Sequence, residues 1–172
     1  MKYLYLTLLL ATINSFGQLI KVDYADGNQK LEGFFAKAQK ANPKKIGVII
    51  LPAWMGVDAH SKESAEALAK LGYHAFVADI YGVGNNPKNT GEAGKNAGFY
   101  KNNPAEYQKR IQLAIDQLVK VGADKNQIAV IGYCFGGTGA IEAARGNLNV
   151  KGVVSFHGGR SEEHTSELQS RQ

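Results

Sequence analysis

The stretch IAVIGYCFGG, residues 128–137, decides the fold. Its first four residues are apolar, as in a buried strand, and a helical pattern follows it. Between the two lies GYCFG, which matches the G-x-C-x-G form of a nucleophile elbow. In an elbow the nucleophile occupies a strained turn between a strand and a helix, so the residues two positions away must be small. The pattern therefore predicts Cys134 as a nucleophile, with Gly132 and Gly136 as the elbow glycines.

The helix that follows the elbow would point its N-terminus at the thiol of Cys134. Free N–H groups and the positive end of the helix dipole favour a thiolate over a thiol. The backbone N–H of Phe135 would then face the oxyanion that forms on a substrate carbonyl. The chain has one cysteine, so no internal disulfide can form. The alternative interpretation is a buried structural cysteine in a tight turn.

The rest of the chain alternates apolar strands with amphipathic helices. An opening hairpin turns at Asp26-Gly27-Asn28, and four strands separated by three helices follow it. This order predicts one α/β domain with a mostly parallel sheet that helices cover on both faces. The predicted strands are 19–24, 31–36, 46–51, 75–80, 128–131 and 150–156, and the predicted helices are 61–71, 104–118 and 136–145.

Two of these helices carry features that predict their ends and their buried faces. Gly72 is expected to end the first helix. Asn103 is expected to cap the second, with Pro104 at its first position and Glu106 completing a capping box. Residues 81–103, rich in Gly and Asn, are expected to form a loop that borders a site or carries a short helix. The predicted apolar stripes are Ala65, Leu68, Ala69 and Leu71 in the first helix and Tyr107, Ile111, Ala114, Ile115 and Leu118 in the second.

The two ends of the chain do not belong to this pattern. Residues 1–17 have a basic start, an apolar run too short for a membrane span, and small residues before Gln18. They predict a cleaved signal peptide and an exported protein, periplasmic or extracellular. Residues 160–172 lack apolar periodicity, and their back-translation matches a common sequencing-library adapter, so we expect them to be non-native. The expected domain, residues 18–159, would then be an incomplete part of a longer protein.

Composition narrows the possible functions. Hydrophobic residues make up 44% and charged residues 20% of the chain, as in an ordinary globular protein. The net charge of +5 is spread along the sequence, so no nucleic-acid-binding surface is expected. Neither a metal-ligand spacing nor a phosphate-binding glycine loop is found, so we expect no metal and no cofactor. The oligomeric state stays open.

Over residues 22–159 the sequence resembles the dienelactone hydrolase family of the α/β-hydrolase superfamily. The resemblance rests on GYCFGG, on VVSFHGG and on IGVIILPAWMGVDAHSKESAEALAKLGYHAFVADIYG. It implies an α/β-hydrolase fold, truncated here before its last strands, and cysteine-dependent hydrolysis of a small-molecule ester or lactone through a thioester. Cys134 matches the nucleophile, and Trp54 matches the residue whose backbone N–H is the second oxyanion donor. Tyr81 and His157, each just after a predicted strand, are candidate pocket residues.

The sequence departs from the family pattern at two positions. Ala53 stands where typical members carry a glutamate that holds and helps to activate the thiol. Val83 stands where some members carry an arginine, so that cationic anchor for a substrate carboxylate is missing. These departures imply a substrate other than a dienelactone and another means of thiol activation.

A cysteine nucleophile also needs a base and a group that orients the base. In this superfamily the order is nucleophile, acid, histidine, and both partners follow the strand expected at 150–156. We therefore expect both to be encoded beyond Gly159. His60 and His74 are expected to be structural or surface residues, and Asp79 is expected to hold a turn.

Two other functions fit parts of the sequence. A class I glutamine amidotransferase-like enzyme also places G-x-C-x-G after a parallel strand, although the opening hairpin and the export signal suit a hydrolase better. A non-catalytic binding protein on the same fold would be consistent with Ala53 and Val83. Reactivity of the Cys134 thiol separates an enzyme from a binding protein.

Overall fold

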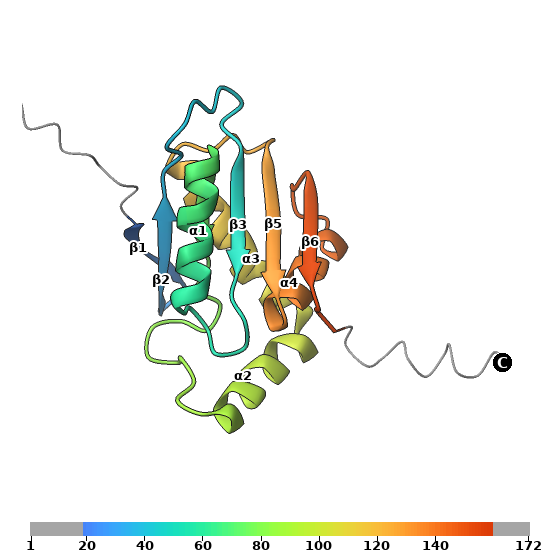
Figure 1. Cartoon of the computed structure of the whole chain (residues 1–172). Coiled ribbons are helices and arrows are strands. Elements are labelled where there is room, and N and C mark those ends of the chain that lie inside the picture. Colours follow the sequence, from blue (N-terminus) through green and yellow to red (C-terminus); the bar gives the residue numbers. More distant parts are fainter. Residues whose placement is uncertain (1–18, 160–172) are drawn as a thin grey trace, which may run out of the picture.

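A computed structural model describes residues 19–159 of the chain as one α/β domain (Figure 1). The expected signal peptide at 1–17 and the expected adapter-derived tail at 160–172 lie outside the described residues, so both stay predictions. In the part of the chain that the structure describes, no helix has the length and apolar character needed to cross a membrane.

Six strands form one mixed sheet in the order β1-β2-β4-β3-β5-β6. The four strands from β3 to β6 pair in parallel, and the β1–β2 hairpin adds to β4 in antiparallel orientation. The mostly parallel sheet is thus confirmed, as is the opening hairpin, whose two-residue turn places Gly27 at φ 55°. The strands are β1 (Leu19–Asp26), β2 (Gln29–Ala36), β3 (Gly47–Leu51), β4 (His74–Val77), β5 (Ile128–Tyr133) and β6 (Gly152–Phe156).

Helices cover both faces of the sheet, as expected. On one face α1 (Ala59–Leu71) buries Ala65 and Ala69 against residues of β2, β3 and β4. The other face carries α3 (Pro104–Lys120) and α4 (Phe135–Arg145), which enclose the larger core. The fourth helix, α2 (Thr90–Asn102), lies beyond the carboxyl ends of β3 and β5 (Figure 1). That edge is where open α/β sheets place their sites.

The buried faces of β3, α1 and α3 follow from the sequence pattern with one exception in α1. All five residues of β3 are buried, as expected for a central strand, and the whole predicted stripe of α3 is buried. In α1, however, Leu71 is 65% exposed, and Ser61 is buried. Leu71 follows Ala69 by two residues, about 200° around the helix, which places it on the outer face.

The first helix starts earlier than predicted, and the second begins at Pro104 as predicted but lacks the predicted cap. The first helix begins at Ala59 rather than at residue 61, because Asp58 caps it through a hydrogen bond to the Ser61 N–H at 2.8 Å. Asn103 makes no side-chain cap for α3, so the predicted capping box is wrong. Its amide instead donates to the Phe99 carbonyl at 2.7 Å and closes the end of α2. Gly72 ends α1 with φ 102°, as predicted.

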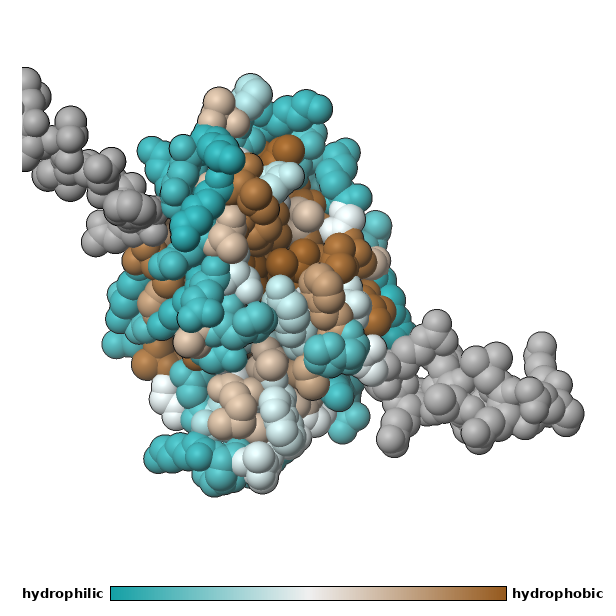
Figure 2. Space-filling model, viewed as in Figure 1, coloured by the Kyte–Doolittle hydropathy of each residue, from teal (hydrophilic) through white to brown (hydrophobic). Residues whose placement is uncertain are grey.

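Apolar side chains lie open beside α1, on the face of the sheet formed by β5 and β6. Figure 2 shows this hydrophobic patch, in which Val154 is 48% and Phe156 43% exposed. Exposed apolar surface of this kind binds hydrophobic dyes and favours association. Strand β6 is also an edge of the described sheet, which adds unpaired backbone groups.

The 172-residue chain is therefore expected to bind the dye ANS strongly and to melt without a sharp cooperative transition. Replacing Val154 and Phe156 together by serine should lower the dye fluorescence. The matched control is Phe99→Ser, since Phe99 is 53% exposed on α2 and lies outside the patch. A cooperative melt with no dye binding would contradict this expectation.

Candidate active site

The strand–turn–helix expected from GYCFG is present in the structure. Cys134 lies between the end of β5 and the first residue of α4, with φ 54° and ψ −113°. Such a positive φ is costly for a non-glycine residue and is maintained only where the surroundings impose it, as at functional sites. The N–H of Cys134 donates to the Phe156 carbonyl at 2.9 Å, which ties the turn to the end of β6. The free thiol is exposed at the carboxyl edge of the sheet.

The two elbow glycines are required by close backbone contacts. A Cβ atom on Gly132 would overlap the carbonyl oxygen of Gly136. A Cβ atom on Gly136 would overlap the carbonyl oxygen of Leu51, at the end of β3. The elbow is thus packed directly against the neighbouring strand, which brings the segment after β3 close to the thiol.

Phe135 occupies the first position of α4, where its backbone N–H has no partner within the helix. Its ring is 2% exposed and stacks on Tyr107 of α3, with ring centroids 4.7 Å apart and planes 9° apart. The hydroxyl of Tyr107 donates to the Phe135 carbonyl at 3.0 Å. The sequence indicated Tyr107 only as a core residue, since nothing in the helical pattern shows where its hydroxyl points.

Trp54 lies in a turn just after β3. The turn is closed by the Gly56 N–H, which donates to the Ala53 carbonyl at 2.9 Å, and Gly56 has φ 83°. The carbonyl of Trp54 accepts a hydrogen bond from the Tyr81 hydroxyl at 2.9 Å. The ring of Tyr81 in turn stacks on Phe135 at 5.5 Å. Tyr81 thus connects the two residues that the sequence suggests as oxyanion donors.

Asp79 holds the turn that leads from β4 to Tyr81. Its carboxylate accepts the N–H of Glu32 at 2.9 Å and of Gly82 at 2.8 Å. Burial raises the pKa of Asp79, while these hydrogen bonds and Arg110 oppose the shift. The contacts agree with the expected structural role. Burial, with smaller contributions from Tyr100 and Cys134, raises the pKa of Tyr81, so its hydroxyl stays protonated and able to donate.

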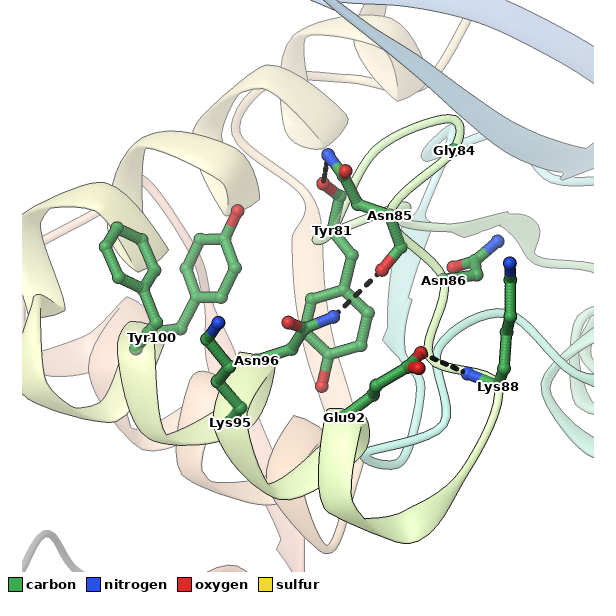
Figure 3. Close-up of a pocket in the computed structure, with 10 residues that line it drawn as sticks. Tyr81, Gly84, Asn85, Asn86, Lys88, Glu92, Lys95, Asn96 and Tyr100 are labelled. Carbon is green, nitrogen blue, oxygen red and sulfur yellow. Dashed lines mark hydrogen bonds between the residues drawn. The ribbon is translucent and has the colours of Figure 1, made fainter.

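A cavity of about 400 Å³ lies between α2 and the loop after β4 (Figure 3). Tyr81 forms part of its wall, whereas Cys134 does not line it. Within the wall, the Asn96 amide donates to the Asn85 carbonyl at 2.8 Å. The Glu92 carboxylate accepts the Lys88 N–H at 2.8 Å and therefore stabilises the N-terminal turn of α2. The lining residues are Tyr81, Gly84, Asn85, Asn86, Lys88, Glu92, Lys95, Asn96, Phe99 and Tyr100.

The histidines of the described residues make no hydrogen bond to the thiol. His157 follows β6 in a left-handed conformation, with φ 45°, and is exposed. It does not line the cavity beside Tyr81, so its pocket role stays a prediction. His60 packs edge-on against Tyr133 at 4.9 Å, and the Nδ1 atom of His74 accepts the Ala38 N–H at 3.3 Å. Within residues 19–159 no group of three His, Cys, Asp or Glu side chains is arranged to hold a metal ion.

Known proteins resemble this chain in sequence and in structure. A Bradyrhizobium protein named "Probable 2-oxo-3-(5-oxofuran-2-ylidene)propanoate lactonase" is 29% identical over 114 residues, which cover 64% of this chain and 45% of that protein. The dienelactone hydrolase-like promiscuous phosphotriesterase P91, from metagenomic libraries, is 32% identical with a TM-score of 0.78. Its alignment covers 87% of this chain and 63% of P91. The structure called m3DLH is 31% identical with a TM-score of 0.77, over 83% of this chain and 60% of its own.

More distant structures share the fold alone. The acylaminoacyl peptidase of Pyrococcus horikoshii is 16% identical, with a TM-score of 0.61 over 83% of this chain and 23% of that one. The chain spans about half to two thirds of the length of its nearer relatives. The profile of the dienelactone hydrolase family matches residues 31–172, well over half of the chain. The resemblance inferred from the elbow is therefore confirmed, and the chain belongs to the dienelactone hydrolase family.

Proposed function

We propose that the protein is a cysteine-dependent hydrolase of carboxylic esters or lactones that acts through a thioester. The observation that carries the proposal is the conformation of Cys134, which is held at φ 54° with its thiol exposed at the N-terminus of α4. A buried structural cysteine has no need of this strained turn or of the two close-packed glycines beside it. The family of the chain supports the ester or lactone bond as the one that is cleaved.

The reaction begins when the Cys134 thiolate attacks the substrate carbonyl carbon and forms a C–S bond. The carbonyl electron pair moves onto oxygen, and the backbone N–H groups of Phe135 and Trp54 stabilise the oxyanion. Collapse of this intermediate breaks the C–O bond and leaves a thioester, with the alkoxide protonated as it departs. In a lactone the departing oxygen stays tethered to the acyl group. Water then attacks the thioester, which yields the carboxylic acid and returns the thiol.

The proton transfers require a histidine and an acid that orients it. Within residues 19–159 no imidazole or carboxylate forms a hydrogen bond with the sulfur of Cys134. We propose that both groups follow Gly159, in the order nucleophile, acid, histidine. The proposed longer protein, in which native sequence after Gly159 supplies these two groups, is called the full-length protein below.

The cavity beside Tyr81 is the proposed place for the part of the substrate remote from the scissile bond. Its volume, about 400 Å³, lies within the range of small-molecule sites. Its amide groups, Lys88 and Lys95 offer hydrogen-bond donors, while Phe99 and Tyr100 offer apolar surface. Val83, which replaces the cationic anchor of some relatives, does not line it.

The proposal is tested by alkylation of the thiol. Iodoacetamide at neutral pH is expected to modify Cys134 of the full-length protein within minutes and to abolish hydrolysis of p-nitrophenyl acetate in parallel. Mass spectrometry of the intact protein measures the modification, and an ester substrate added first should slow it. A thiol that stays unmodified while the protein is folded, or activity that survives complete modification, would contradict the proposal and favour a binding protein. The amidotransferase alternative is not supported, because the family match points to hydrolases of esters and lactones.

A further inference from the structure

Tyr81 touches both segments that carry the proposed oxyanion donors. Its hydroxyl donates to the carbonyl of Trp54 at 2.9 Å, and its ring stacks on Phe135 with planes 20° apart. We infer that Tyr81 is a positioning residue, which fixes the separation between the N–H groups of Trp54 and Phe135. The inference rests on the proposed function, because it assigns a role within the same reaction.

The turn that carries Trp54 needs such an anchor. Its two large side chains, Trp54 and Met55, are each 38% exposed and so anchor it only in part. The hydrogen bond from Gly56 to Ala53 shapes the turn but does not attach it to the elbow. Among the described residues, the Tyr81 hydroxyl makes the one hydrogen bond that joins residues 53–56 to another part of the chain. Without that hydrogen bond, the backbone N–H of Trp54 would be free to shift relative to that of Phe135.

Tyr81 is itself held in place by its surroundings. It is 3% exposed, and the hydrogen bonds of Asp79 to two backbone N–H groups fix the turn just before it. The Asn85 amide donates to the Tyr81 carbonyl at 3.2 Å, and the ring of Tyr100 lies 5.9 Å away. A side chain held from several sides can impose its position on the more exposed turn.

The elbow side has a matching contact. Tyr107 stacks on Phe135 and donates its hydroxyl to the Phe135 carbonyl at 3.0 Å. A tyrosine hydroxyl therefore donates to the carbonyl of each residue that carries a proposed oxyanion donor. One of these residues, Trp54, follows β3, and the other, Phe135, begins α4. Preorganised donors of this kind stabilise charge without rearrangement during the reaction. The protonated state of the Tyr81 hydroxyl, which burial and the nearby Cys134 favour, keeps its hydrogen bond intact when the thiolate forms.

The test is Tyr81→Phe in the full-length protein, which keeps the stacked ring and removes the hydroxyl. We expect kcat for p-nitrophenyl acetate to fall roughly 10- to 30-fold with KM changed less than about 2-fold, a smaller loss than direct removal of an oxyanion donor causes. The rate of Cys134 alkylation by iodoacetamide should stay the same, because that displacement forms no oxyanion. The matched control is Tyr73→Phe, since Tyr73 lies before β4 at the opposite end of the strand and makes no such contact.

Each outcome separates the inference from the function on which it rests. A Tyr81→Phe protein with unchanged kcat would overturn the inference and leave the proposed function intact. An equal loss of hydrolysis and of alkylation would also overturn it, because it would show damage to the thiol rather than to the oxyanion site. A wild-type protein without Cys134-dependent hydrolysis would overturn the proposed function, and the inference with it. Thermal melts of Tyr81→Phe and Tyr73→Phe exclude unfolding as the cause of a loss.

Discussion

Replacing Cys134 by alanine in the full-length protein is expected to lower kcat/KM for p-nitrophenyl acetate at least about 10³-fold. The change removes the proposed nucleophile, so any remaining rate would come from binding and from the proposed oxyanion donors alone. The side chain of Cys134 is exposed, so its removal leaves no cavity in the core. The measurement is initial-rate kinetics together with a thermal melt, which should coincide with that of the wild type.

Cys134→Ser is the informative companion of this variant. A serine fits the same elbow, but its hydroxyl is a weaker nucleophile than a thiolate without a base tuned to it. We expect activity well below that of the wild type, and no alkylation by iodoacetamide at position 134. If Cys134→Ala kept most of the hydrolysis, the nucleophile would be another group and the thioester mechanism would be wrong.

The second large effect is expected on stability. Gly136→Ala should lower the free energy of unfolding of the full-length protein by at least about 3 kcal/mol, since overpacking against rigid structure is among the costliest substitutions. The new Cβ would overlap the carbonyl oxygen of Leu51, and both backbone segments are fixed, one in α4 and one at the end of β3. Urea unfolding followed by circular dichroism measures the change.

The control applies the same substitution to a glycine without neighbours. Gly94 lies in the interior of α2, is exposed, and has open space where a Cβ would be added. Gly94→Ala is therefore expected to stabilise the protein by about 0.5–1 kcal/mol through helix propensity. If both substitutions had the same small effect, the close packing at the elbow would not be the reason for its glycine.

The elbow could be predicted because its constraints are local in sequence. The glycines at 132 and 136, the cysteine between them and the apolar residues before them are all contained in ten residues. The buried strand β3 and the stripe of α3 were equally clear from periodicity. By contrast, α2 was expected only as a loop or a short helix, because its three glycines lower helix propensity. Ala93, Ala97 and Tyr100, spaced to share one face, are buried and hold this helix in place.

The features that the sequence could not show depend on tertiary contacts. Asn103 has a side chain typical of an N-cap, but its amide instead donates to the Phe99 carbonyl at the end of α2. The hydroxyls of Tyr81 and Tyr107 reach the carbonyls of Trp54 and Phe135 across 27 and 28 residues of chain. No spacing rule links such positions. The contacts of Tyr81 with Trp54 and of Tyr107 with Phe135 therefore could not be expected from the sequence.

The residue that carries one of these donors also offers a spectroscopic signal. Trp54 is the single tryptophan of this chain, and the structure places its partly exposed indole in the turn that Tyr81 anchors. Within this chain, tryptophan emission excited beyond the tyrosine absorption band therefore reports from that turn. Acyl-enzyme formation, or release of the turn in Tyr81→Phe, would change the polarity and quenching around the indole. The turn thus carries a natural fluorophore with which its environment can be followed during pre-steady-state kinetics without a label.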